Sequence, residues 1–228
     1  MISIAIPVYE MNSSGAEFLK LSLSKICQQN FNDIEVVVSD HSKDDEIKNV
    51  CDTFEGLIKI VYLKNEEKRG SSSANLNNAL KHCSGEIIKI LMQDEYLYDE
   101  DALEKIKQIF DEDSNTNWLI TSCVFGTTPD VIKGSMNPKY TEKIVNGINT
   151  IGSPSVLTIR NSNIEYFNED LLWVMDCEYY KRLYDKFGPP SVLEKNCVFI
   201  VQHQNQVSSI LSEEFKKNEV KLLEEKFK

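Results

Sequence analysis

Ile87–Glu95, with the sequence IIKILMQDE, is an apolar run that ends abruptly in two adjacent acids. Buried strands of open α/β sheets are near-continuous apolar runs, so the stretch predicts an interior strand, interrupted only by Lys89. Ligands of such sheets bind at the carboxyl ends of the strands. Asp94 and Glu95 therefore predict a ligand site at that edge of the sheet.

Three further strands alternate with helices before this stretch. The expected strands are Ile2–Val8, Ile34–Val38 and Ile58–Leu63, and the expected helices begin near Ser14, Asp44 and Ser71. Four strands and three helices in about ninety residues predict a parallel, doubly wound α/β sheet, because right-handed crossovers join parallel neighbours through helices. The loops after the strands are then expected to gather at one edge.

The rest of the chain continues the α/β pattern less regularly. The expected elements are helices at Asp99–Phe110 and Asp176–Phe187, and strands at Trp118–Val124, Val156–Arg160 and Val198–Gln202. Between them, Gly126–Ile151 loses its periodicity and is rich in Gly, Pro, Asn and Thr. Such a composition predicts a long loop or a small insertion, which would suit a lid.

The last residues predict a helix that opens at Ser212 and ends near Lys228, with acids early and bases late as the helix dipole prefers. An apolar stripe is expected from Phe215, Leu222, Leu223 and Phe227. We interpret it as a packing or self-association face. A membrane-surface role is the weaker alternative, because the polar face mixes both charges.

The composition is that of an ordinary soluble protein: 228 residues, 41% hydrophobic and 27% charged. A net charge of −11 argues against nucleic acid as a partner, because nucleic acid rewards clustered Lys and Arg. Six cysteines without a CxxC pair predict reduced, mostly buried thiols. No apolar run reaches the length of a membrane span and the start lacks a basic signal region, so we expect a cytoplasmic protein.

An ordered set of short motifs lies within roughly the first hundred residues. The motifs are Ile4–Tyr9 (IAIPVY), Val37–Ser42 (VVSDHS), Arg69–Ser72 (RGSS) with Asn77, Gly85–Ile87 (GEI) and Gln93–Glu95 (QDE). Together they resemble a family 2 glycosyltransferase, a nucleotide-diphospho-sugar transferase of the GT-A fold. The resemblance implies a Rossmann-like, mostly parallel sheet flanked by helices in a single domain over residues 1–228. Its parts would be a nucleotide-binding half (1–100), an acceptor-side half (101–210) and a C-terminal helix (211–228).

The resemblance also implies how a nucleotide is held. The matching positions are Pro7, Tyr9, Asp40, Arg69, Gly70 and Asn77. In the family, the residue at Tyr9 stacks on uracil and the carboxylate at Asp40 accepts the uracil N3–H. Without the resemblance, Tyr9 would be interpreted as a surface aromatic, an alternative that the neighbouring Pro7 weakens, and Asp40 is equally a helix cap, because capping uses the same residue types.

A divalent metal, Mn²⁺ or Mg²⁺, is implied at the end of the acidic strand. Asp94 matches the second Asp of the family's DxD metal motif, whereas Met92 stands where the motif has its first acid. His203 is placed like the C-terminal histidine that completes the metal site or touches the phosphates in related enzymes. Glu95 would hold water or sugar hydroxyls. The alternative is that both acids only cap the following loop and that His203 is structural.

The resemblance continues in the last third, where Phe167–Asp170 (FNED) and Trp173–Glu178 (WVMDCE) are similar to the acceptor-side segment. Asp176 matches the general base that takes the proton of the acceptor hydroxyl. Trp173 is a candidate platform for sugar stacking, and Glu178 a candidate acceptor contact. Alternatively, Asp176 and Glu178 only favour the start of a helix, and Trp173 belongs to the core.

We therefore predict a glycosyltransferase that moves a sugar from a UDP-sugar to a hydroxyl of a saccharide or lipid-linked acceptor. The resemblance implies inversion, a role in cell-surface polysaccharide or glycolipid synthesis, and action in the cytoplasm or at the periphery of a membrane. A nucleotide-binding module without catalysis is the alternative, because Met92 and Met175 replace usual acids. Nucleotidyl transfer is less favoured, since Pro7–Glu10 is not a Gly-rich, basic loop.

Overall fold

The protein is built around one nine-stranded sheet, in a computed structural model that describes residues 1–128 and 130–228. Four parallel strands form its first half, in the spatial order β3 (Lys59–Lys64), β2 (Ile34–Asp40), β1 (Ile2–Val8) and β4 (Ile87–Ile90). Every residue of β1, β2 and β4 is buried. The parallel sheet and the interior position of the strand at Ile87 are therefore confirmed.

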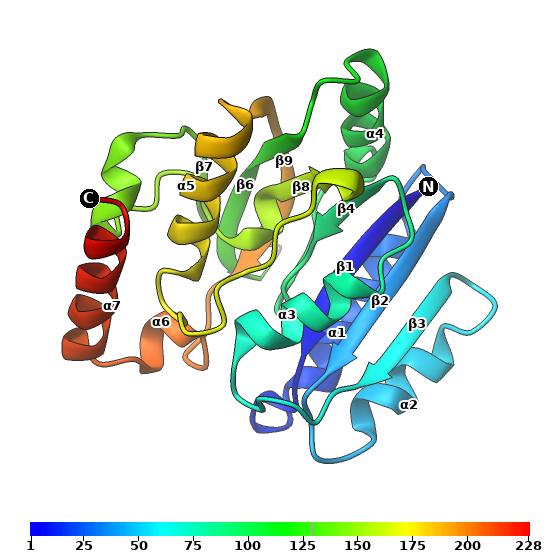
Figure 1. The fold of residues 1–228 in the computed structure, drawn as a ribbon. Helices are drawn as coiled ribbons and strands as arrows, with labels where there is room; N and C mark the ends of the chain where they lie inside the picture. The colour runs from blue at the N-terminus through cyan, green and yellow to red at the C-terminus, as the bar shows by residue number, and fades with distance from the viewer. Residues whose placement is uncertain (129) are drawn as a thin grey trace.

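Three helices connect these strands and cover both faces of the sheet: α1 (Gly15–Cys27), α2 (Glu46–Thr53) and α3 (Ser72–Lys81). The chain crosses the sheet in one direction through α1 and α2 and returns through α3. Right-handed crossovers then require α3 to lie on the opposite face, where Figure 1 shows it in front of the strands. The hydroxyl of Ser71 caps α3 by accepting the N–H of Ala74, as the serine-rich start predicted.

The second half of the sheet is mixed rather than parallel. Beyond β4 follow β8 (Leu157–Arg160), β6 (Trp118–Thr128), β9 (Ser191–Val201) and β5 (Glu95–Leu97). Only the β6–β9 pairing is parallel; β4–β8, β6–β8 and β5–β9 are antiparallel. The expectation of a parallel sheet thus holds for β3, β2, β1 and β4, and the α/β class holds for the whole protein.

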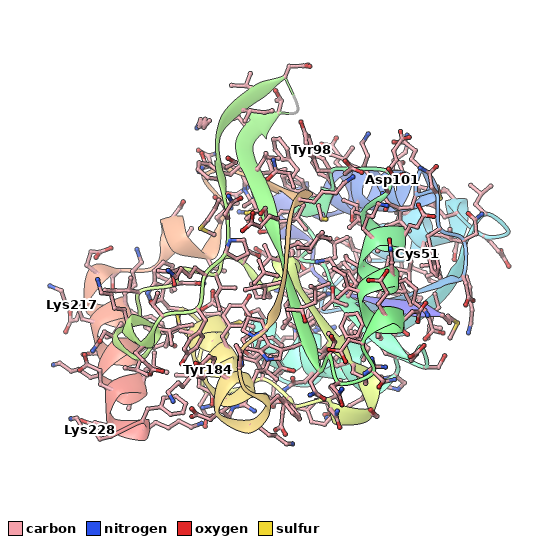
Figure 2. All side chains as sticks on the ribbon, turned by 90° about the horizontal axis from the view of Figure 1, so that it is seen from above. Cys51, Tyr98, Asp101, Tyr184, Lys217 and Lys228 are labelled. Carbon is pink, nitrogen blue, oxygen red and sulfur yellow. The ribbon has the colours of Figure 1, made fainter. Side chains whose placement is uncertain are left out.

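The region Gly126–Ile151 is only partly the loop that was expected. β6 continues to Thr128, and β7 (Val131–Met136) pairs with it as an antiparallel hairpin. The hairpin extends beyond the rest of the molecule in Figure 2. Most of β7 is exposed, so its sequence lacks the apolar alternation by which buried strands are recognised.

The remaining elements pack around this sheet. They are η1 (Met11–Ser13), α4 (Ala102–Glu112), η2 (Glu142–Asn146), η3 (Pro154–Val156), η4 (Asn161–Asn163), α5 (Met175–Phe187), α6 (Val207–Ile210) and α7 (Glu213–Lys226). In the described part of the chain, no helix is long and apolar enough to cross a bilayer. All six thiols are free and four of them are buried, as the cysteine spacing predicted.

The C-terminal helix α7 packs on the domain next to α5, far from β3 (Figure 1). Leu223 is fully buried and Phe227 packs against the same core, whereas Phe215 and Leu222 are 39% and 55% exposed. The expected single apolar stripe is therefore wrong, because its four members lie on two faces of the helix. The packing face is confirmed.

Glu219 connects α7 to the start of α5. This buried carboxylate accepts the backbone N–H groups of Leu172, Trp173 and Val174, at 2.6–3.1 Å. The first N–H groups of a helix and those just before it have no partner within the helix, so a carboxylate placed there satisfies them and favours the positive end of the dipole. The position of α5 thus depends on a residue more than forty positions later in the chain.

Candidate functional site

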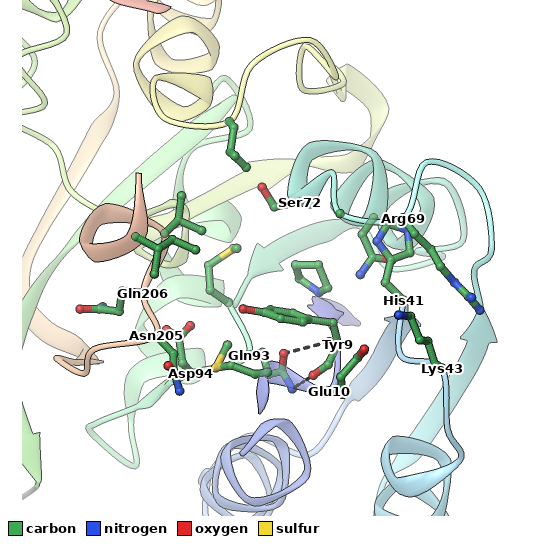
Figure 3. Close-up of a pocket in the computed structure, with 18 residues that line it drawn as sticks. Tyr9, Glu10, His41, Lys43, Arg69, Ser72, Gln93, Asp94, Asn205 and Gln206 are labelled. Carbon is green, nitrogen blue, oxygen red and sulfur yellow. Dashed lines mark hydrogen bonds between the residues drawn. The ribbon is translucent and has the colours of Figure 1, made fainter. Parts of the chain in front are cut away.

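A cavity of about 450 Å³ lies at the carboxyl edge of the parallel strands, where the acid-tipped strand predicted a site. Its walls come from the ends of three strands and from loops that converge on them. The lining residues lie in the segments 7–11, 41–43, 69–75 and 92–94, together with Leu172 and residues 205–210 (Figure 3).

Tyr9 lies at the centre of this cavity, with its side chain 39% exposed. The Tyr9 N–H donates to Gln93 Oε1 at 3.0 Å, and Gln93 Nε2 donates back to the Tyr9 carbonyl at 2.8 Å. In Figure 3 the ring lies between Arg69 on one side and Asp94 on the other. Burial and then the charge of Asp94 raise the pKa of the Tyr9 phenol, so it stays neutral at physiological pH.

Gly15 allows this arrangement because α1 begins directly against it. A Cβ atom at Gly15 would lie 2.1 Å from the Tyr9 carbonyl oxygen and 2.6 Å from Gln93 Nε2. No side chain fits at that distance without displacing the backbone. The glycine after Ser14 therefore serves the site as well as the start of the helix.

Gln93→Ala is expected to weaken binding of UDP several-fold and to lower the free energy of unfolding by about 1–3 kcal/mol, because two backbone groups of Tyr9 lose their partners. Calorimetry with UDP and chemical denaturation would measure the two effects. Gln108→Ala, which removes an exposed amide on α4, is the matched control and should change neither. Unaltered UDP binding by Gln93→Ala would contradict the role given to this pair.

Asp94 lines the other end of the cavity, and His203 contacts it from just outside the cavity wall. Asp94 Oδ2 lies 2.8 Å from His203 Nε2, and both side chains are 15% exposed. The fold explains this contact across 109 positions of sequence. Since β5 and β9 are antiparallel, with Glu95 opposite Ile200, the residue before β5 lies beside the residues that follow β9.

The donor set of this pair fits a divalent metal in part. A carboxylate and an imidazole suit Mn²⁺ in particular, with Mg²⁺ preferring oxygen. Among the residues that the structure describes, no group of three or more His, Cys, Asp or Glu side chains could hold a metal ion. Asp94 and His203 would therefore have to share a metal with ligand oxygens and water, and Met92 lines the cavity without adding a donor.

Glu95 faces the interior instead of the cavity, so its predicted contact with sugar hydroxyls is not supported. Glu95 is the first residue of β5 and is buried, whereas Asp94 lies in the preceding turn and lines the cavity. Its carboxylate accepts the hydroxyl of Ser153 at 2.7 Å. Burial, with the charge of Asp94, raises the pKa of Glu95 to about 8, so the group carries a proton in much of the neutral range.

Of the predicted nucleotide-binding residues, Pro7, Tyr9, Arg69 and Gly70 line the cavity. Gly70 has φ +92°, a left-handed conformation that favours glycine, and it brings the backbone to the cavity wall. Arg69 forms an exposed ion pair with Glu66, at 3.4 Å. These positions agree with the motif.

Asp40 and Asn77 lie outside this wall, and their assignment to nucleotide binding needs correction. Asp40 is fully buried, and its two oxygens accept the Tyr62 hydroxyl (2.6 Å), the Lys64 ammonium (3.1 Å) and the Ser42 N–H (2.7 Å). Asn77 uses its amide on the Phe167 backbone and on the Glu169 carboxylate. Both residues hold neighbouring segments in place.

The sequence did not predict every lining residue, and His41 and Asn75 are two that it missed. His41 is buried in the cavity wall, with Nε2 3.0 Å from Asn65 Nδ2. Burial lowers the pKa of its imidazole, so it is neutral at physiological pH. Asn75 lines the cavity from α3 and donates to the Val8 carbonyl at 2.9 Å. The position of His41 directly after the second strand was the available signal.

Asp176 lies beside the cavity, in the first turn of α5. The preceding Met175 contacts the hydroxyls of Ser72 and Ser73 through its sulfur, and Ser72 lines the cavity. The N-cap of α5 is Val174, so Asp176 lies inside the first turn of the helix, where its charge also favours the positive end of the dipole. The Asp176 oxygens accept hydrogen bonds from Asn149 Nδ2 and from the Cys177 N–H, each at 2.7 Å. Burial raises the pKa of Asp176 to about 6.

Trp173 and Glu178 do not reach the cavity. The Trp173 ring packs beneath the Lys216 ammonium, 4.9 Å from the ring centroid, on the side of α7. Glu178 is fully buried, and its oxygens accept Arg182 and Lys226. A saturated, buried carboxylate cannot bind an acceptor, so the prediction for Glu178 is wrong. Sugar stacking on Trp173 stays a prediction.

Glu178→Ala is expected to lower the free energy of unfolding by about 3 kcal/mol, because removing the carboxylate leaves the Arg182 guanidinium partly buried without it. It should leave nucleotide binding unchanged. Urea denaturation and UDP calorimetry would measure this, with the exposed Glu225→Ala on α7 as control. A loss of acceptor affinity without a loss of stability would restore the original assignment.

Comparison with known proteins gives a consistent result. The family model described as glycosyl transferase family 2 matches residues 3–153. The chain is 28% identical over 97 residues to a GalNAc(5)-diNAcBac-PP-undecaprenol beta-1,3-glucosyltransferase of Campylobacter jejuni, covering 42% of this chain and 30% of that protein. It is 32% identical over 100 residues to an uncharacterized glycosyltransferase of Rickettsia conorii, covering 43% and 15%. The chain thus spans less than a third of these curated relatives.

Solved structures share the fold over more of the chain. S. aureus TarS (residues 1–349) in complex with UDP-GlcNAc has a TM-score of 0.76 at 21% identity, covering 97% of this chain and 65% of that one. The mannosyltransferase PcManGT of Pyrobaculum calidifontis, in complex with GDP-Man and Mn²⁺, has a TM-score of 0.61 at 18% identity, covering 88% and 56%. At these identities the likeness establishes a common fold.

Proposed function

Because the chain belongs to glycosyl transferase family 2, we propose that it transfers a sugar from a UDP-sugar to a hydroxyl of a saccharide or lipid-linked acceptor, with inversion at the anomeric carbon. One observation carries the proposal. A single cavity at the carboxyl edge of the sheet has an aromatic ring, Tyr9, at its centre and Asp94, hydrogen bonded to His203, at one end. A nucleotide-sugar needs an aromatic ring on which its base can stack and polar groups beside its diphosphate.

The nucleotide would lie across Tyr9, with its base toward Arg69 and its diphosphate toward Asp94. Stacking accepts any flat base, so Tyr9 alone does not select uracil. Asp40 has its oxygens engaged and would have to exchange a partner to reach a base. The choice of UDP rests on TarS, whose structures contain UDP and UDP-GlcNAc, whereas PcManGT holds GDP-Man. Both nucleotides therefore belong in the test.

Asp94 and His203 are the residues that would hold a divalent metal, and such a metal would neutralise negative charge on the departing diphosphate. The PcManGT complex contains Mn²⁺, which supports this choice. Asp94 and His203 are already in contact through one hydrogen bond, so either side chain can orient the other toward the cavity.

Asp176 would act as the general base. Its carboxylate would take the proton of the acceptor hydroxyl while that oxygen forms a bond to the anomeric carbon and the bond from this carbon to the diphosphate breaks. A pKa of about 6 keeps the group charged at pH 7 and still basic enough to accept a proton. Residues 1–100 would then hold the nucleotide, residues 101–210 would present the base, and α7 would brace α5.

The acceptor would be a saccharide or a lipid-linked sugar of the kind used for cell-surface polysaccharides. The Campylobacter relative is named for an undecaprenol-linked substrate, and an acceptor of that type would bring the protein to a membrane surface. No membrane-spanning helix is needed for such contact.

Release of nucleoside diphosphate tests the proposal directly. The protein would be incubated with UDP-Glc, UDP-GlcNAc, UDP-Gal or GDP-Man, with Mn²⁺ or EDTA, and with undecaprenyl-diphosphate-linked acceptors. Acceptor-dependent release of UDP is the expected result. Calorimetric binding of UDP without release across this panel would favour a nucleotide-binding module without catalysis, and the absence of binding would overturn both.

A further inference from the structure

The turn Asn149–Ser155 joins the two parts of the proposed site. Near its end, Ser155 Oγ accepts the N–H of Met92 at 2.7 Å, and Ser153 Oγ donates to Glu95, also at 2.7 Å. Both contacts fix the segment that carries Asp94. The sequence signal here was weak, because the turn lies in a stretch without apolar periodicity.

At the other end of the turn, Asn149 contacts the proposed base. Its Oδ1 accepts the N–H groups of Ile151 and Gly152, each at 2.9 Å. Its Nδ2 donates to the Gly152 carbonyl at 2.9 Å and to Asp176 Oδ2 at 2.7 Å. Since Oδ1 is used twice by N–H donors, the amide has one orientation, and a donor must face Asp176.

The turn that carries this amide is held firmly. Gly152 has φ +123°, and a Cβ atom there would lie 2.8 Å from the terminal methyl of Met136. The Tyr180 hydroxyl donates to the carbonyls of Gly152 and Ser153, at 3.2 and 3.1 Å. Asn149 therefore presents its donor from a backbone that has little freedom to move.

We propose that Asn149 is a positioning residue for sugar transfer: its amide fixes the Asp176 carboxylate in the orientation that receives the acceptor proton and stabilises its charged form. This role rests on the proposed function, because Asn149 acts only through Asp176. Asp176 accepts hydrogen bonds from Asn149 Nδ2 and from the Cys177 N–H, and the Cys177 thiol also acts as a donor to it. Both groups of Cys177 belong to the helix that carries Asp176, so the Asn149 amide is the contact from outside that helix and sets the rotation of the side chain.

The surroundings of Asp176 make this one bond important. Burial raises the pKa of Asp176, and the N–H and thiol of Cys177, followed by the Asn149 amide, oppose that rise. The titratable groups that face Asp176 are the Cys177 thiol and the Tyr180 phenol, and burial raises the pKa of each, so both are neutral at pH 7. The described groups around Asp176 thus offer it no compensating positive charge.

Asn149→Asp tests the proposal with a side chain of the same size. The new carboxylate can still accept the two N–H groups of the turn, but it faces Asp176 without a donor. We expect kcat to fall about tenfold or more, because the base is misplaced and protonated, and the acid limb of the kcat–pH profile to move upward by about one unit. The KM for the UDP-sugar and the melting temperature should change little.

Asn146→Asp is the matched control, since Asn146 is an exposed amide that donates to the Glu224 carboxylate at 2.9 Å. It makes the same chemical change away from the site and should retain the unaltered kcat and pH profile. If Asn149→Asp does not fold, Asn149→Ala deletes the same bond and should move kcat and the acid limb in the same directions.

A second measurement is independent of turnover. Titration of the Asp176 carboxyl by ¹³C NMR should show a higher pKa in Asn149→Asp than in the unaltered protein. If Asn149→Asp left kcat, the acid limb of the pH profile and the titration of Asp176 unaltered, the proposal would be overturned although the protein was still a transferase. A rise in the KM for the UDP-sugar at constant kcat would overturn it as well. An unaltered protein that transfers no sugar to any acceptor would overturn the proposed function and this role together.

Discussion

Asp176→Asn is expected to lower the turnover of sugar transfer by roughly 10²- to 10⁴-fold, the range in which a positioned general base contributes. An amide of the same shape cannot accept the acceptor proton. Binding of UDP should be unchanged, because Asp176 lies beside the cavity and not in its wall. Steady-state turnover with a saturating acceptor and calorimetry with UDP would separate the two effects.

The exposed Asp170→Asn in the same segment is the control for this substitution and should retain turnover. The pH dependence gives a second check. Because burial raises the pKa of Asp176 to about 6, kcat should fall as the pH drops through about 6 and level off above it. A flat profile between pH 5 and 8, or wild-type turnover by Asp176→Asn, would exclude this residue as the base.

Asp94→Ala should have the second-largest effect, a fall in turnover of roughly 10²- to 10³-fold, as expected when one stabilising group for a developing charge is removed. His203→Ala should act in the same direction, since the two side chains are hydrogen bonded. The double variant should be little worse than Asp94→Ala alone, because residues that act as a unit are not additive.

Turnover with Mn²⁺ and with EDTA would measure these effects, and Asp111→Ala on the exposed face of α4 is the control. Met92 replaces the first acid of the usual motif, so Asp94 carries more of the site than in a DxD enzyme. If the fold-decrease in turnover of the double variant equalled the product of the fold-decreases of the two single variants, Asp94 and His203 would act separately. Full activity of Asp94→Ala would remove this residue from the site.

The first four strands could be predicted because their signal is local. Apolar runs such as Ile34–Val38 are bounded by turn residues, and the parallel arrangement follows from the helices between them. The carboxyl edge, and with it Tyr9 and Asp94, follows from the same reasoning. Strand β7 was not predicted, because most of it is exposed and its sequence therefore lacks the period of a half-buried strand.

The direction of each carboxylate could not be predicted from type and position. Glu95 and Asp94 are adjacent, yet Glu95 begins β5 and is buried, whereas Asp94 lies in the preceding turn and lines the cavity. In the sequence, Glu178 has the type and position of a site residue. In the structure, Lys226, nearly fifty positions later, binds its carboxylate. The role of a carboxylate depends on partners far along the chain, and neither the periodicity of the sequence nor a short motif predicts those partners.

Glu219 has a practical consequence for fragments of this protein. Its carboxylate satisfies three backbone N–H groups at the start of α5, so a truncation before α7 would expose those groups and release the helix that carries Asp176. A minimal catalytic fragment must therefore keep residues 213–226, even though they contribute nothing to the cavity wall. Fusion partners and affinity tags are best joined after this helix.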